Sequence, residues 1–102
     1  MNETNELKLL LILCASGRAD EVRRLIEQRR VEGFTEIPEL EGAGVTGRHL
    51  GSRAFPGTTS LIFTALAPEP AAALVAALAE LQKRCDPGEG LRVFALDAAA
   101  ML

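Results

Sequence analysis

Apolar residues gather in three runs of strand length along the chain. Leu7–Cys14 (LKLLLILC) and Thr59–Leu66 (TSLIFTAL) are apolar on both parities, which predicts strands buried on both faces at the centre of a sheet. Leu91–Leu96 (LRVFAL) is a third run. Phe34–Glu41 (FTEIPELE) alternates only weakly and contains Pro38, which cannot donate to a ladder, so this segment predicts an edge or bulged strand.

The segments between these strands have helical patterns. Gly17–Arg30 predicts a helix with Ser16 as its N-cap and an apolar stripe of Val22, Leu25 and Ile26. A second helix is expected to start at the APEP segment, residues 67–70, and to run to Arg84, with Leu74, Val75, Leu78 and Leu81 on one face. The turn CDPGEG, residues 85–90, ends it, and DAAAML is expected to close the chain as a short helical or irregular tail.

The element order predicts an α+β, ferredoxin-like βαββαβ fold for residues 1–102 as one domain. The two strongly apolar strands belong at the centre, which gives the strand order 4-1-3-2 with both helices on one face. The last strand is then an edge, although LRVFAL is nearly as apolar as the central strands. An exposed apolar edge promotes association, so the sequence predicts a homo-oligomer.

Candidate binding residues cluster in the glycine-rich stretch between the second and third strands, GAGVTGRHLGSRAFPGTT, which contains the loop 42–58. Glycine leaves amide groups approachable, and arginine donates in a planar fork to carboxylate or phosphate. The candidate ligand-binding residues there are Gly44, Gly47, Arg48, His49, Gly51 and Arg53. A solvated loop with ordinary surface charges is the alternative.

The predicted strand directions bring two further segments to the same end of the domain. These are the end of the first strand, residues 14–18, and the turn CDPGEG. The turn and the strand after it supply a second wall of candidate ligand-binding residues, Gly88, Glu89, Gly90 and Arg92. An ordinary helix-to-strand turn is the alternative.

Charge and composition narrow the classes of partner. The net charge is −3, the pI is near 5.1, and the 102 residues include no Tyr or Trp, so neither nucleic acid nor an anionic membrane is an expected partner. The longest apolar run, Leu9–Ala15, is too short to span a bilayer, and MNETNELK is not a basic signal-peptide start. We therefore expect a cytoplasmic protein.

Metal binding and catalysis have little support in the sequence. Cys14, His49, Cys85 and Asp86 fall at the same predicted end and include soft ligands suited to zinc or copper, but no close ligand spacing links them. Each cysteine is expected to fill apolar space. No set of residues fits the roles of nucleophile, base and orienter, so the sequence predicts a protein that is not an enzyme.

Two passages carry a resemblance to a known family. GEGLRVFALDA, residues 88–98, and FTEIPELEGAG, residues 34–44, resemble the PII signal-transduction family of nitrogen regulation and its PII-like relatives. The resemblance implies a homotrimer with small-molecule clefts between subunits, an adenine nucleotide or other small anion as ligand, and a protein target contacted by the 42–58 loop.

The sequence departs from the nucleotide-binding members of that family. Leu91 stands where they have a lysine, the tail DAAAML has no basic residue, and the loop has no tyrosine, so ATP binding in the standard manner is not implied. Two alternatives share the fold. A CutA-like metal module would use His49 and the cysteines, and an ACT-type small-molecule sensor would be a dimer.

Overall fold

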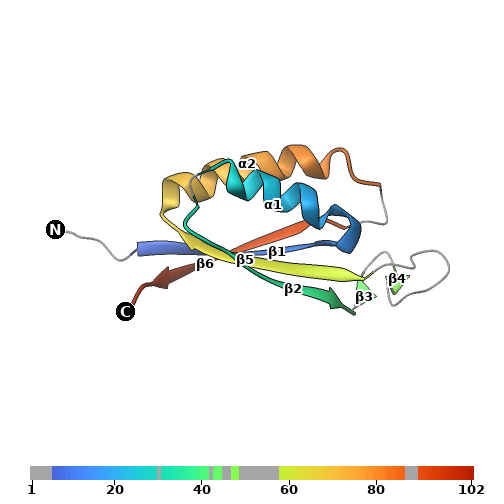
Figure 1. Cartoon of the computed structure of the whole chain (residues 1–102), viewed down its shortest axis with the longest axis horizontal. Helices are drawn as coiled ribbons and strands as arrows, with labels where there is room; N and C mark the ends of the chain where they lie inside the picture. The colour runs from blue at the N-terminus through green and yellow to red at the C-terminus, as the bar shows by residue number, and fades with distance from the viewer. Residues whose placement is uncertain (1–5, 30, 42, 45–46, 49–57, 87–89) are drawn as a thin grey trace.

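The computed structural model describes residues 6–29, 31–41, 43–44, 47–48, 58–86 and 90–102. The main elements are β1 (Glu6–Ala15), the 3-10 turn η1 (Ser16–Arg18), α1 (Ala19–Glu27), β2 (Thr35–Leu40), β5 (Thr59–Leu66), α2 (Pro68–Gln82) and β6 (Arg92–Ala99). A small hairpin of β3 (Ala43–Gly44) and β4 (Gly47–Arg48) follows β2. It lies at one end of the molecule (Figure 1).

The four long strands form one antiparallel sheet in the order β2-β5-β1-β6. This confirms the predicted order 4-1-3-2 and the ferredoxin-like α+β fold. Both helices cover the same face of the sheet, and the opposite face carries no element of the described part of this chain (Figure 1). The strands that are apolar on both parities are the central ones, as expected from their pattern.

The core lies between the sheet and the two helices. Alternate residues of β1, namely Leu10, Ile12 and Cys14, point into it, and Val22 and Ile26 of α1 meet them. The helix α2 contributes Ala71, Leu74, Leu78 and Leu81. Val75 is 38% exposed, so its predicted place on the packed face is wrong, and Ala71 takes it. Within the described ranges, no helix is long and apolar enough to cross a bilayer.

The strand residues that alternate with the core residues point to the opposite side of the sheet, where they form an apolar face that the helices do not cover. Residues opposite one another in an antiparallel ladder project to the same side, and Leu11 pairs with both Phe63 and Phe94. Leu9 pairs in the same way with Leu96. Phe94 and Leu96 are 50% and 48% exposed, which is a large apolar exposure for a protein surface.

The two edge strands differ in regularity. The register of β2 shifts between Ile37 and Leu40, where Pro38 cannot donate and Glu39 has a φ of 60°. By contrast, β6 pairs continuously with β1 and extends to Ala99, so the predicted helical or irregular tail from Asp97 is wrong.

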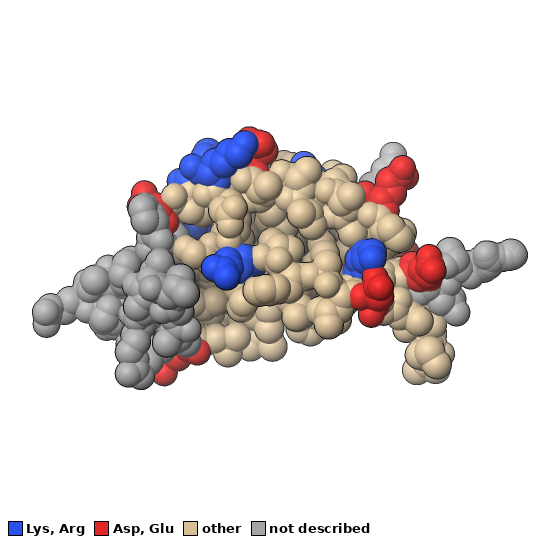
Figure 2. Space-filling view, turned by 180° about the vertical axis from the view of Figure 1, so that it is seen from behind, with Lys and Arg blue, Asp and Glu red and all other residues tan. Residues whose placement is uncertain are grey.

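Seen from behind, the molecule carries a broad uncharged area in its middle, with charged atoms mostly towards its ends and upper edge (Figure 2).

Candidate functional site

Three segments converge at the end of the sheet where β1 stops. Ala15 pairs with Thr59, the first residue of β5, and Thr59 also pairs with Leu40, the last residue of β2. On the other side of β1, Leu13 pairs with Arg92. The end of β1, both ends of the 42–58 loop and the start of β6 therefore meet at one end of the domain, as the strand order predicts.

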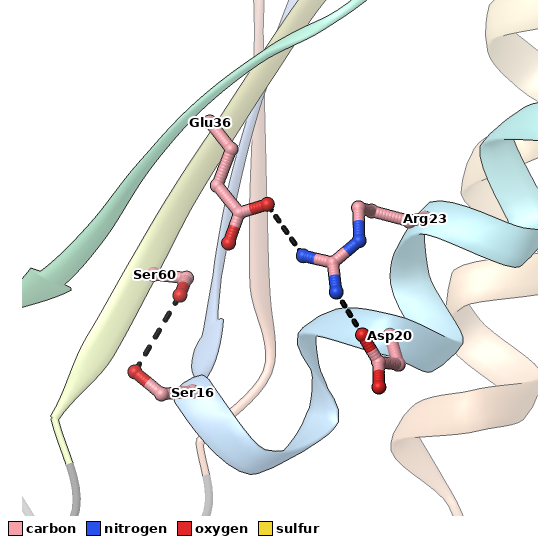
Figure 3. A network of polar contacts seen from close by, with 5 residues as sticks. All are labelled: Ser16, Asp20, Arg23, Glu36 and Ser60. Atoms are coloured by element: carbon pink, nitrogen blue, oxygen red, sulfur yellow. Dashed lines mark hydrogen bonds and ion pairs between the residues drawn. The ribbon is translucent and has the colours of Figure 1, made fainter.

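Hydroxyl groups join the end of β1 to the end of the loop. The Ser16 backbone N–H donates to the Thr58 carbonyl at 2.8 Å, and the two side-chain hydroxyls lie 2.9 Å apart. Ser16 Oγ also lies 3.5 Å from the hydroxyl of Ser60, which is 1% exposed (Figure 3). The prediction of Ser16 as N-cap is wrong, because Arg18 precedes α1 and no side chain caps it. Ser16 instead fixes the loop end against β1.

Arg18 connects this end of the domain to the end of α2. Its guanidinium donates to Glu21 Oε1 at 2.8 Å and to the Arg84 carbonyl at 3.2 Å. Gln82 makes a second connection, because its side-chain amide donates to the Leu91 carbonyl at 2.6 Å. The start of α1, the end of α2 and the start of β6 are thus held together by polar contacts around the converging segments.

An ion-pair network fixes β2 against α1. The Arg23 guanidinium donates to Glu36 Oε1 at 2.5 Å and also binds Asp20 one turn earlier (Figure 3). The Glu36 side chain is only 20% exposed, whereas that of Asp20 is 76% exposed. Glu36 is therefore a paired carboxylate that is largely shielded from solvent, although it belongs to an edge strand.

The two cysteines are free thiols in or beside the core. Cys14 is fully buried, and burial raises its pKa from 9.0 to about 11, with a smaller contribution from nearby Glu36. A raised pKa disfavours the thiolate that a metal requires. Within the part of the chain that the structure describes, no three His, Cys, Asp or Glu side chains cluster as metal ligands. His49, which the metal alternative needs, lies outside that part.

The predicted ligand-binding residues are only partly described. Gly44, Gly47 and Arg48 belong to the β3–β4 hairpin, in which Gly44 pairs with Gly47 and Ala43 with Arg48. Gly90 has a φ of 61° at the entry to β6, a conformation that favours glycine, and Arg92 is exposed. The other predicted residues lie outside the described ranges: His49, Gly51, Arg53, Gly88 and Glu89. Their role in ligand binding stays a prediction.

Arg92 projects onto the uncovered face of the sheet. It pairs with Leu13, whose parity is opposite to that of the helix-covered Ile12 and Cys14. Leu91, the preceding residue, is 4% exposed and belongs to the core. Arg92 therefore places a positive charge at the end of an otherwise apolar face, beside the converging segments.

Sequence reasoning missed the polar contacts that organise this end. The sequence marks Thr58 and Ser60 only as the border of a strand, and Arg23 only as part of a charged helix face. Their partners are distant in sequence, so no local pattern indicates them. The one available signal is Glu36, an acidic residue on the parity that faces the helices in β2.

Solved structures of PII-like proteins have the same fold as this chain. The nitrogen regulatory PII-like protein CPII from Thiomonas intermedia K12, solved bound to ADP, AMP and bicarbonate, superposes with a TM-score of 0.78 and 19% identity, over 97% of this chain and 99% of that one. Its apo form gives a TM-score of 0.74 and 18% identity, over 93% and 91% of the two chains.

A protein from Thermus thermophilus described as PII-like and signalling gives a TM-score of 0.68 and 17% identity, over 97% of this chain and 93% of that one. No protein-family profile and no curated protein sequence matches the chain. The likeness to solved structures therefore shows a PII-like fold.

Proposed function

We propose that this chain is a PII-like regulatory protein without catalytic activity of its own. Homotrimers would bind a small anionic ligand, of the adenine nucleotide or bicarbonate kind, in clefts between subunits. Ligand binding would change the 42–58 loop and its fit to a protein target in the cytoplasm. The observation that carries the proposal is the convergence of both loop ends, the end of β1 and the start of β6 at one end of the sheet.

The uncovered sheet face supports assembly from several copies. Leu11, Phe63 and Phe94 form a continuous cross-strand row on this face, and Leu9 and Leu96 extend it. Burying apolar surface contributes roughly 25 cal/mol per Å², so a face with two half-exposed large side chains favours a cover. Further copies of the chain would supply that cover and remove the exposed edge of β6.

The position of Arg92 supports a ligand site between subunits. Arg92 lies on the same face as Leu13, at the end where the loop begins. A neighbouring copy packed on this face would therefore bring its own surface against Arg92. Arginine binds carboxylate and phosphate in a bidentate manner, which suits a small anion held between two copies.

The ligand class takes support from the solved PII-like structures. CPII is described as bound to ADP, AMP and bicarbonate, all of which are small anions. In this chain a core leucine, Leu91, replaces the lysine of nucleotide-binding family members, so ATP in the standard manner is the weakest candidate. ADP, AMP and bicarbonate are the probes to use first.

Native mass spectrometry and calorimetry with these probes would test the proposal. We expect a trimer that binds at least one probe, and loss of that binding in Arg48→Ala/Arg53→Ala with the trimer intact. Arg24→Ala, an exposed change on α1, is the matched control and should bind normally. A wild-type chain that binds none of the probes would contradict the ligand class, and unchanged binding in the double variant would exclude these two arginines.

The assembly has its own test. Phe94→Asp places a charge on the uncovered sheet face and should reduce the trimer to monomers. Val75→Asp places the same charge on an exposed apolar residue of the helical layer and should leave the trimer intact. A monomeric wild-type protein, or equal masses for both variants, would overturn the proposed interface.

A further inference from the structure

The outer surface of α2 is apolar along most of its length. The side of α2 turned away from the sheet exposes Ala72, Ala73, Ala76 and Ala79, while Leu74, Leu78 and Leu81 pack inward. A helix that is apolar on all sides is normally buried. In contrast, α1 exposes Asp20, Arg24, Glu27 and Gln28, which is an ordinary solvated face.

Charged residues lie towards the two ends of this outer surface, with Glu69 at one end and the exposed Glu80–Lys83 ion pair at the other. Glu69 lies in the first turn of α2, and Lys83 follows the last residue of the helix, with its side chain 71% exposed. Glu69, Ala72, Ala76, Ala79 and Lys83 follow the alternating three- and four-residue spacing of a helix–helix seam. Glu80 pairs with Lys83 within the helix at 3.1 Å.

This arrangement is self-complementary in one orientation. When two copies of α2 lie antiparallel about a two-fold axis through Ala76, Glu69 of each copy faces Lys83 of the other. The same axis places Ala73 of each copy opposite Ala79 of the other, and Ala72 opposite Glu80, whose carboxylate stays paired with Lys83 beside it. A parallel pair about a two-fold axis would instead place Glu69 against Glu69. Alanine at the seam allows the close approach, about 8 Å between axes, that tight helix pairs reach.

We infer that the outer face of α2 is a second self-association surface, on which α2 of another copy packs antiparallel with Glu69 opposite Lys83. It lies on the opposite side of the sheet from the uncovered apolar face, so both surfaces can be occupied at once (Figure 1). The inference is independent of the proposed ligand and loop function.

The size of the surface sets the strength of the association. A helix of 15 residues is about 22 Å long, and its alanine face is narrow, so one pair buries less than a standard stable interface. A single pair is therefore weak and depends on concentration. Several pairs formed together between two larger assemblies gain avidity, because the second contact becomes intramolecular.

Disulfide cross-linking tests both the contact and its orientation. In a Cys85→Ser background under mild oxidation, Ala76→Cys should form dimers roughly tenfold faster than Glu27→Cys, the control on the solvated face of α1. Glu69→Cys alone and Lys83→Cys alone should cross-link slowly, whereas a mixture of the two should give the mixed dimer.

Each result decides one point. Equal rates for Ala76→Cys and Glu27→Cys would overturn the contact, and rapid self-linking at all three α2 positions would overturn the antiparallel orientation. The same experiment in a Phe94→Asp background separates this surface from the sheet face. Without avidity the reaction should be slower there, but at raised protein concentration Ala76→Cys should still cross-link faster than Glu27→Cys. Equal rates for these two variants in that background would show that the α2 contact is only a by-product of the sheet-face assembly.

Discussion

Arg23 of α1 and Glu36 of β2 form an ion pair at 2.5 Å across the boundary between the helical layer and the sheet. Both side chains are largely shielded, with exposures of 31% and 20%. Glu36 lies just before the register shift of β2, beyond which the chain enters the glycine-rich loop. The pair therefore fixes the last regular part of the edge strand that leads into the loop.

We predict that breaking this pair destabilises the fold more than breaking the neighbouring exposed pair. Arg23→Ala and Glu36→Gln should each lower the free energy of unfolding by about 1–2 kcal/mol, since a partly buried charge loses its partner. Asp20→Asn should cost under about 0.5 kcal/mol because that carboxylate is exposed. Urea unfolding in two double-mutant cycles would measure both couplings. Equal coupling of Arg23 to Asp20 and to Glu36 would contradict the prediction.

The raised pKa of Cys14 predicts a loss of stability at alkaline pH. Its folded pKa of about 11 lies above the ordinary 9.0, so between these values the folded state holds a proton that the unfolded state releases. The free energy of unfolding should therefore fall as pH rises from about 9, by up to roughly 2–3 kcal/mol near pH 11. Cys14→Ala should remove this slope, while Cys85→Ala should keep it.

The measurement is urea unfolding between pH 8 and about 9.5. Within this range Lys8 stays charged in both states, because its ordinary pKa of 10.5 lies above the range and the hydrogen bond to Asp97 raises its folded pKa further. A slope that survives in Cys14→Ala would show that another group causes it.

The burial of Leu91 predicts that a lysine at this position would destabilise the fold. The side chain is 4% exposed and packs in the core, so Leu91→Lys should lower the free energy of unfolding by about 3 kcal/mol or more. Leu91→Met, of similar volume, should cost under about 1.5 kcal/mol. Chemical unfolding of both variants is the measurement. A stable Leu91→Lys variant that binds ATP would contradict the structure at this residue.

The fold was largely predictable because the pattern of each strand indicates its position in the sheet. Leu7–Cys14 and Thr59–Leu66 are apolar on both parities, and only a central strand needs that pattern. The predictions were wrong where packing or pairing with distant residues determines the local structure. Val75 fits the helical stripe as well as Ala71 does, and Asp97–Ala99 has little strand preference of its own but pairs with the first residues of β1.

The candidate site was predictable in its location but not in its contacts. The strand directions alone bring Ser16, Thr58 and Arg92 to one end of the domain. The Ser16 hydroxyl meets Thr58 across a separation of 42 residues, and a serine before a helix has the same local signature whether it caps the helix or holds a loop. The uncovered sheet face was not predictable for a similar reason. Apolarity on both parities shows that both faces of the sheet need a cover, but it does not show that the helices of this chain cover only one face.

Because Leu40 and Thr59 are paired with each other, the intervening chain leaves and re-enters the sheet at a single step of the ladder. The entropy of closing such a loop rises only slowly with its length, by about 0.6 kcal/mol for each doubling. Evolution could therefore lengthen or shorten this segment, and so change what it reaches, while the cost to the rest of the domain stays small. Homologues with the same sheet are expected to vary most between these two residues.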